Sequence, residues 1–264
     1  LNASKYDDLS YKLYEDAVTV VKNEETILPI ANLESETIAF VKLGDDDSSQ
    51  YVEALKKYTA VTEVKRDSLP QLMDELKKYT TVIVGYHKAD GAWKKHDYSN
   101  KELQWLDTIA KNKKVILTSF AKPYTLNNIK NFKNIKVVVQ AHQNNIFANT
   151  VAAEIIFGAI GSKGAMQVSA GGFKVNQALH TKPLERLGFT TPENVGLSSV
   201  KLKQIDAIAQ KAIKEKMTPG CQVLVARHGK VVYQKSFGYQ TYDNTTPVKN
   251  TDIYDCLLYT SDAA

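Results

Sequence analysis

The residues best suited to chemistry lie in the segment HKADGAWKKHDY, residues 87–98, directly after the apolar run TVIVGY. His87 and His96 carry imidazoles that can exchange protons near neutral pH, and Trp93 and Lys94 can contact a ligand or another domain. Ligands of open α/β sheets bind beyond the carboxyl ends of the strands. We therefore predict a substrate-facing or domain-facing loop, in which His87, Trp93 and Lys94 are exposed. An ordinary polar surface loop is the alternative.

The same segment is a poor metal site. Its possible ligands are His87, Asp90, His96 and Asp97. Nine positions separate the two histidines, whereas zinc ligands usually recur at the short spacing of one helix face or a tight turn. The two cysteines, Cys221 and Cys256, are too few for a four-cysteine site. We assign no metal and no cofactor.

Phosphate-binding signals are also weak. The glycine-rich stretch 158–164 follows a helical pattern and lacks the G-K-[ST] ending of a phosphate loop, so it predicts a turn that ends a helix. Asp45, Asp46 and Asp47 follow a strand pattern that ends near Gly44. Three carboxylates would repel a phosphate from a helix N-terminus, and we predict helix-capping residues there.

Two S-x-x-K arrangements could mark a serine nucleophile with a lysine one helical turn away. They are Ser119–Lys122 and Ser198–Lys201. The first lies at a predicted strand end, and the second at a predicted helix start that Ser198 or Ser199 could cap. Neither is followed by S-D-N or K-T-G. We assign no catalytic residue.

The elements that position these residues alternate regularly over the first 160 positions. Short runs rich in β-branched residues alternate with stretches of helical spacing, and a last helix spans about 145–160. This order predicts an α/β domain with a mainly parallel sheet sandwiched by helices. The predicted strands are 37–43, 60–64, 81–86, 115–119 and 135–140.

The pattern changes after residue 160. Glycines and prolines punctuate 161–196, which indicates a linker or an extended connection, with a boundary near 172–195. An amphipathic helix is predicted over 199–217, followed by strands 222–226 and 230–237 that join at His228-Gly229. A helix plus a β-hairpin is an incomplete α+β segment.

Composition excludes several classes of protein. The 264 residues are 43% hydrophobic and 24% charged, which is typical of globular chains. The net charge of +5 is carried by scattered lysines and not by a basic stripe with aromatics, so no nucleic-acid partner is predicted. No apolar stretch approaches the roughly 20 residues of a membrane span. The chain begins at Leu1, and we expect any targeting signal to lie outside it.

Two segments carry a resemblance to a known family. AVTVVKNEETILPI (17–30) and AAEIIFGAIGSKGAMQV (152–168) resemble the opening and closure of the C-terminal domain of family 3 glycoside hydrolases. The resemblance implies that 1–172 is this α/β domain. It also implies that the domain docks on an N-terminal barrel of the same chain, where the catalytic carboxylates of the β-N-acetylhexosaminidase branch lie.

A third segment has a different relative. Residues 219–255, PGCQVLVARHGKVVYQKSFGYQTYDNTTPVKNTDIYD, resemble the start of the serine β-lactamase and penicillin-binding-protein superfamily. The resemblance implies a linker at 173–196 and the first part of a serine-hydrolase domain at 197–255. The last nine residues, CLLYTSDAA (256–264), resemble translated sequencing-adapter sequence and are predicted to be non-native.

Together the resemblances imply a bacterial glycosidase that hydrolyses β-linked glycans, N-acetylglucosaminides in particular. They also imply a periplasmic, cell-envelope or secreted location. Because the barrel and the serine-hydrolase nucleophile are absent from this sequence, we expect the chain by itself to be inactive. The alternative is a non-enzymatic flavodoxin-like binding or docking module, because such sheets host many functions.

Overall fold

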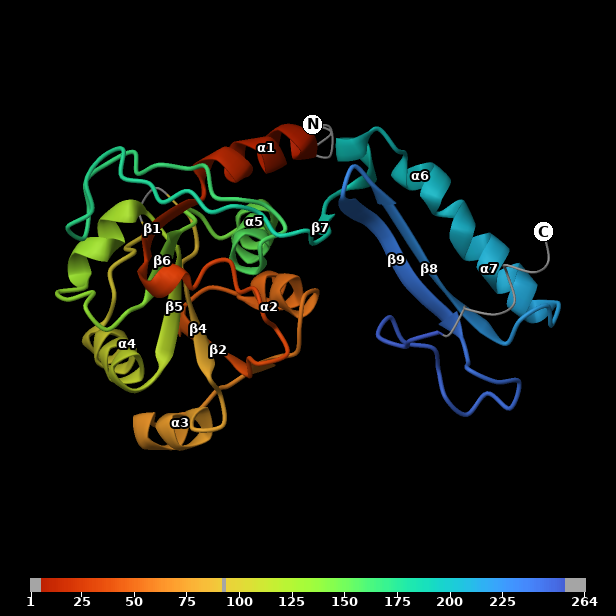
Figure 1. Ribbon diagram of the computed structural model, residues 1–264, viewed down its shortest axis with the longest axis horizontal. Coiled ribbons are helices and arrows are strands. Elements are labelled where there is room, and N and C mark those ends of the chain that lie inside the picture. The colour runs from red at the N-terminus through yellow and green to blue at the C-terminus, as the bar shows by residue number, and fades with distance from the viewer. Residues whose placement is uncertain (1–5, 92–93, 255–264) are drawn as a thin grey trace. The chain divides into compact units, whose positions relative to one another are not determined.

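The computed structural model describes residues 6–91 and 94–254. The chain folds into two compact units, residues 1–188 and 189–264 (Figure 1). The first unit is a helix-flanked sheet, and the second is a helix with a small sheet. Each is described by itself below.

The first unit is built on a six-stranded sheet in the order β1-β6-β5-β4-β2-β3. Every neighbouring pair is parallel except β1 with β6, which confirms the predicted mainly parallel sheet. The order of the parallel strands reverses between β2 and β4, which makes their carboxyl ends the switch point of the fold. The strands are β1 (Thr19–Asn23), β2 (Ile38–Gly44), β3 (Val61–Glu63), β4 (Thr81–His87), β5 (Lys114–Phe120) and β6 (Val137–Gln140).

Strand β1 was not among the predicted strands. It lies within the segment that resembles the opening of the glycosidase domain, and it pairs antiparallel with β6 through a register shift between Val20 and Lys22. Its other edge is covered, since Leu179 N donates to Val20 O at 2.8 Å and Gln177 Nε2 to Val21 O at 3.1 Å. An edge covered in this way offers no open template for another strand.

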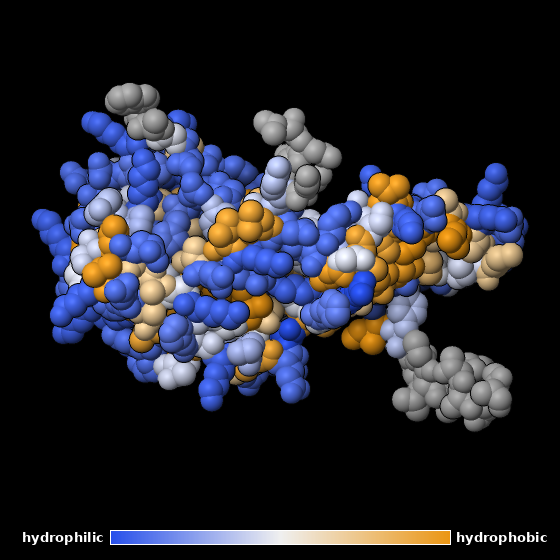
Figure 2. All heavy atoms as spheres, turned by 90° about the horizontal axis from the view of Figure 1, so that it is seen from above, coloured by the Kyte–Doolittle hydropathy of each residue, from blue (hydrophilic) through white to orange (hydrophobic). Residues whose placement is uncertain are grey.

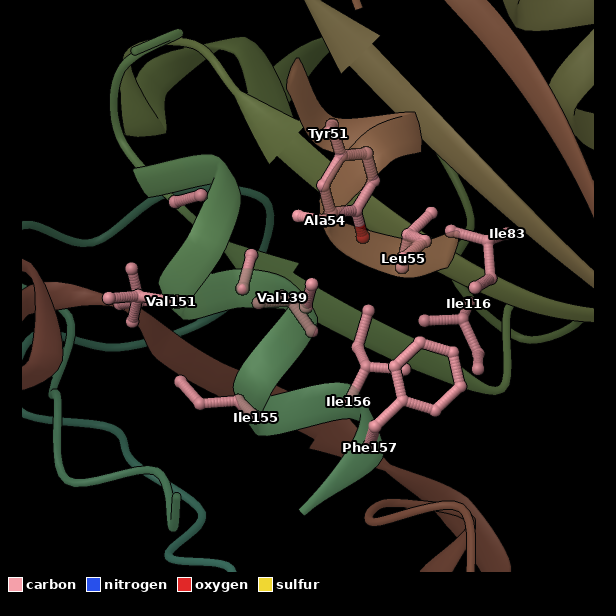
Figure 3. Close-up of a cluster of buried hydrophobic side chains, with 14 of the residues drawn as sticks. Tyr51, Ala54, Leu55, Ile83, Ile116, Val139, Val151, Ile155, Ile156 and Phe157 are labelled. Carbon is pink, nitrogen blue, oxygen red and sulfur yellow. The ribbon is translucent and has the colours of Figure 1, made fainter. Parts of the chain in front are cut away.

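Helices cover both faces of this sheet and create two hydrophobic cores. Helices α1 (Asp7–Ala17), α2 (Ser49–Lys56) and α5 (Ile146–Phe157) pack on one face, and Figure 3 shows the side chains of that core. Helices α3 (Leu69–Leu76) and α4 (Asn100–Asn112) pack on the other. Strands buried on both faces explain the near-continuous apolar runs in the sequence.

Helix α5 ends where the glycines predicted a turn, because Gly158 adopts the left-handed conformation (φ +75°). The following chain runs back along the first unit. Arg186 donates from Nη1 to Ile30 O and Phe157 O, both at 2.6 Å, and from Nη2 to Ala31 O at 2.6 Å. The part of the predicted linker that precedes residue 188 is therefore hydrogen-bonded to the first unit.

The second unit contains a three-stranded sheet in the order β7-β9-β8, with β7 (Gly188–Phe189), β8 (Gly220–Arg227) and β9 (Lys230–Gly238). The hairpin turn is at His228-Gly229 as predicted, and both residues have positive φ (52° and 74°), as a type I′ turn requires. The helix predicted over 199–217 is instead two segments, α6 (Ser199–Leu202) and α7 (Gln204–Lys214), after the short 3₁₀ turn η4 (Pro192–Val195).

Surface hydropathy differs between the units. In the view of Figure 2 the first unit is mostly hydrophilic, and hydrophobic residues gather over the second. Among the described residues, no helix combines the length and the apolar character needed to cross a membrane.

Candidate functional site at the strand carboxyl ends

The candidate site lies at the switch point, where β2 and β4 end side by side. Gly44 pairs with His87 in the last register position, and the backbone N–H of Asp46 donates to His87 O at 3.3 Å. The loop after β6 reaches the same place through Asn144. Residues from three strand ends thus meet at the position where doubly wound sheets bind ligands.

His87 lies at the centre of this cluster and is fully buried. Its ring stacks on Phe120 with centroids 4.5 Å apart, and the Tyr51 ring is 5.8 Å away. A Cβ at Gly85 would be 2.5 Å from His87 Nε2, so glycine is needed there to make room for the imidazole. The prediction that His87 is exposed is wrong. Strand β4 extends to residue 87 and directs this side chain into the core covered by α2 and α5.

A hydrogen-bond network sets the chemistry of His87. Asn144 Nδ2 donates to Asp46 Oδ2 at 2.7 Å and to Asp47 O at 2.8 Å, which leaves Asn144 Oδ1 to accept from His87 Nδ1 at 3.0 Å. The proton therefore lies on Nδ1, and Nε2 is an acceptor with no hydrogen-bond partner within the described part of the chain. Burial lowers the pKa of His87 to about 4, so the imidazole is neutral near pH 7.

Lys88 carries the charge next to this network. Its Nζ lies 3.2 Å from Asp45 Oδ2 and 5.6 Å from the centroid of the Tyr86 ring. Burial alone would raise the pKa of the Asp45 carboxyl, but the hydrogen bond and the charge of Lys88 hold it below its ordinary value. This cluster thus presents an ion pair and the additional carboxylates of Asp46 and Asp47, which favour a neutral or cationic ligand over a phosphate.

His96 and Lys94 are the other predicted loop residues that the structure describes. His96 is also buried, with its carbonyl accepting from Tyr86 Oη at 2.6 Å and its Nδ1 accepting from Lys122 N at 3.4 Å. Burial and then the charge of Lys122 lower the pKa of His96. Lys94 is exposed, as expected, and Trp93 lies outside the described residues. Contact of this loop with a substrate or another domain stays a prediction.

Three residues of the cluster were not recognised from the sequence as site residues: Asp46, Lys88 and Asn144. The aspartates were predicted to cap a helix, which is wrong for Asp45 and Asp46, because these carboxylates bind Lys88 and Asn144. Asp47 alone accepts from Ser49 at the start of α2. The signal available was position, since all of these residues follow the carboxyl end of a predicted parallel strand.

The serines of the two S-x-x-K arrangements have structural positions. Ser119 is fully buried near the end of β5, and Ser198 caps α6 by accepting from Lys201 N at 3.3 Å. Within residues 6–91 and 94–254, no group of three or more histidine, cysteine, aspartate or glutamate side chains is arranged to hold a metal ion.

Comparison with known proteins gives matches among solved structures. No protein-family model and no curated protein matches the sequence. A fungal multi-domain GH3 β-N-acetylglucosaminidase with a GCN5-related glucosamine N-acetyltransferase region matches 67% of this chain and 21% of its own, at 19% identity and a TM-score of 0.54. A GH3 β-N-acetylglucosaminidase from Paenibacillus sp. str. FPU-7 (13% identity, 66% of this chain, 32% of that chain, TM-score 0.45) is also similar. The GH3 β-glucosidase of Bifidobacterium adolescentis is similar as well (13% identity, 63% of this chain, 29% of that chain, TM-score 0.46).

At these identities the likeness concerns the fold: a mainly parallel six-stranded sheet flanked by helices is shared with a domain-sized part of a family 3 glycosidase structure. The chain spans between 21% and 32% of the length of these solved chains.

Proposed function

We propose that the first unit is the C-terminal α/β domain of a family 3 glycoside hydrolase that acts on β-linked glycans, N-acetylglucosaminides in particular. The observation that carries the proposal is the sheet itself, with five parallel strands and an antiparallel edge strand, matched to a fungal GH3 β-N-acetylglucosaminidase structure. The two segments that resemble the family lie at β1 and α5, which bracket this sheet in sequence.

In this proposal the domain shapes the substrate site without performing the chemistry. A retaining glycosidase needs two carboxyl groups about 5 Å apart, one as nucleophile and one as acid/base. Both would be supplied by a barrel domain of the same chain, against which the carboxyl ends of β2 and β4 would dock. The ion pair of Asp45 with Lys88 and the exposed Lys94 offer hydrogen bonds to neutral sugar hydroxyls or to the barrel surface.

The second unit completes the proposal. We propose that residues 197–255 begin a serine-hydrolase module of the β-lactamase type, in a bacterial protein of the periplasm, cell envelope or exterior. The helix followed by a hairpin and the segment 219–255 support this assignment.

The test uses the full natural protein that contains this chain, next to the chain alone. We expect the full protein to hydrolyse an aryl β-N-acetylglucosaminide, and the chain alone to turn over neither that substrate nor nitrocefin nor a short-chain aryl ester. Lys94→Ala and Trp93→Ala in the full protein should raise KM or lower kcat. The matched control is Lys77→Ala, at an exposed position just after α3. A full protein without glycosidase activity would contradict the proposal and favour the non-enzymatic docking module.

A further inference from the structure

A second candidate binding site lies away from the strand carboxyl ends, in a groove beside α4. Most crossovers of the parallel sheet contain an α-helix, but the connection from β5 to β6 has only the short 3₁₀ segment η3 (Pro123–Asn128) and extended chain. This leaves a cavity of about 330 Å³ between α4 and residues 128–135. Its volume lies at the lower end of the range of about 300–1,000 Å³ that is typical of small-molecule sites.

The lining of this groove combines an apolar floor with a ring of side-chain amides. The floor includes Leu106, Ile129 and Ile135, each less than 10% exposed. Five carboxamides surround it: Asn100, Gln104, Asn128, Asn131 and Asn134. Each carboxamide offers a donor and an acceptor without net charge.

Most of this hydrogen-bonding capacity is unused by the protein. Asn128 Oδ1 accepts from Tyr98 N at 3.2 Å and Asn131 Oδ1 from Lys133 N at 2.7 Å, so the amide nitrogens of both remain available as donors. The side chains of Gln104 and Asn134 make no hydrogen bond within the described residues. Two charged side chains line the groove: Asp107, which is paired with Lys111 at 2.6 Å, and the exposed Lys130, whose ammonium group can donate to a ligand oxygen.

We propose that this groove binds a neutral polyhydroxylated ligand of one or two sugar rings. Neighbouring hydroxyls of a sugar ring donate and accept in pairs, which suits uncharged carboxamides, and its C–H faces suit an apolar floor. A hydrocarbon ligand would cover amide groups that make no hydrogen bond to the protein, at a cost in desolvation. The site is independent of the switch-point cluster and of the proposed glycosidase activity.

The test is an NMR titration of the whole chain with cellobiose, and separately with N,N′-diacetylchitobiose, observed at the side-chain amide signals. At least one of the two should cause saturable shifts at Gln104 and Asn134. Replacing both by alanine should weaken binding about tenfold, because the double variant lacks two of the hydrogen bonds proposed to hold the sugar. The matched control is Gln50→Ala, an exposed carboxamide on α2 that should leave the affinity unchanged.

Several outcomes would overturn the proposal. They are the absence of saturable shifts with both sugars, equal binding by the double variant, or an equal response to N-methylacetamide, which has an amide but no ring of hydroxyls. Gln104→Ala alone serves as the second variant, because Gln104 is exposed and its side chain makes no hydrogen bond that folding could lose. A twofold or larger loss of affinity in this variant supports the site, and an unchanged affinity counts against it.

Discussion

The two units of this chain use burial very differently. The first places a parallel sheet between two helical layers and buries side chains on both faces. In the described part of the second, only Ala209, Val231, Phe237 and Val248 are buried hydrophobic residues. Large apolar side chains of the second unit are exposed instead, including Val200 (73%) and Ile208 (67%). Because apolar burial is the dominant favourable contribution to folding, we expect the first unit to hold most of the stability.

The largest expected effect is therefore a core deletion in the first unit. Phe157 is fully buried at the end of α5 and stacks on Tyr58 with centroids 5.1 Å apart. Phe157→Ala should lower the free energy of unfolding by about 3–5 kcal/mol. Urea unfolding followed by tryptophan fluorescence measures this unit selectively, because Trp93 and Trp105 both belong to it.

The matched control lies in the second unit. Ile208→Ala removes an exposed side chain and should change stability by less than about 0.5 kcal/mol, measured by hydrogen exchange of the β8 and β9 amides. Protection of those amides equal to that in β4 and β5 would contradict the comparison, because it would require the second unit to be as stable as the first.

The sequence was informative about the first unit because its signals are local. Runs such as TVIVGY predicted every parallel strand to within a few residues, and Gly158 predicted the end of α5. Strand β1 was not predicted, because no local pattern near Thr19–Asn23 indicates its pairing with β6, which lies more than a hundred residues further along the chain. Pairing of distant segments depends on the whole fold, and a single strand pattern does not specify it.

The candidate site was predictable in place but not in detail. The rule for strand carboxyl ends selected the segment after β4, and the binding role of this segment stays a prediction. It did not give the burial of His87, which follows from one further strand residue and from the aromatic rings of Tyr51 and Phe120. Nor did it give the role of Asn144, which comes from a loop 57 residues further along the chain.

Because the His87 imidazole is buried, we expect the unfolding free energy of the first unit to depend on pH. The pKa of His87 is lowered to about 4 from its ordinary 6.5, mainly by burial, so the unfolded chain binds this proton more readily than the folded one. The neutral His87 side chain therefore gives its full contribution to stability above pH 6.5, and this contribution is lost as pH falls towards 4. Over that window His87 should account for up to about 3 kcal/mol of unfolding free energy.

The control for this effect is His87→Gln, which keeps a donor for Asn144 but does not titrate. The free energy of unfolding, measured with urea at several pH values from 7 to 4, should fall more steeply for the natural chain than for the variant. The charged groups that face the imidazole, Lys42, Asp46 and Asp47, are the same in both proteins. Parallel curves would show that His87 is protonated as easily in the folded as in the unfolded chain.

The smallest expected effect on stability comes from removing a helix cap, and we compare one cap from each unit. Ser99 forms a full capping box on α4: its Oγ accepts from Glu102 N at 3.2 Å, and Glu102 Oε2 accepts from Ser99 N at 2.7 Å. Glu102 Oε1 also accepts from Gly44 N at 2.7 Å, which ties α4 to the end of β2. Ser99→Ala should therefore lower the unfolding free energy of the first unit by about 1 kcal/mol, and Ser99→Thr should restore most of it.

Ser198→Ala in the second unit should cost less, a few tenths of a kcal/mol, for two physical reasons. Its bond to Lys201 N is long, at 3.3 Å, and Glu193 Oε1 already accepts from Ser199 N at 2.8 Å, so one first-turn donor stays satisfied. Helix α6 is also only four residues long and buries none of them, so its loss removes little packing. Hydrogen exchange of residues 198–204 measures the second variant, and tryptophan-detected urea unfolding measures the first. If Ser198→Ala lowered the stability of its helix as much as Ser99→Ala does, the second unit would depend on its helix caps as strongly as the first. The difference in apolar burial would then not explain a difference in stability between the two units.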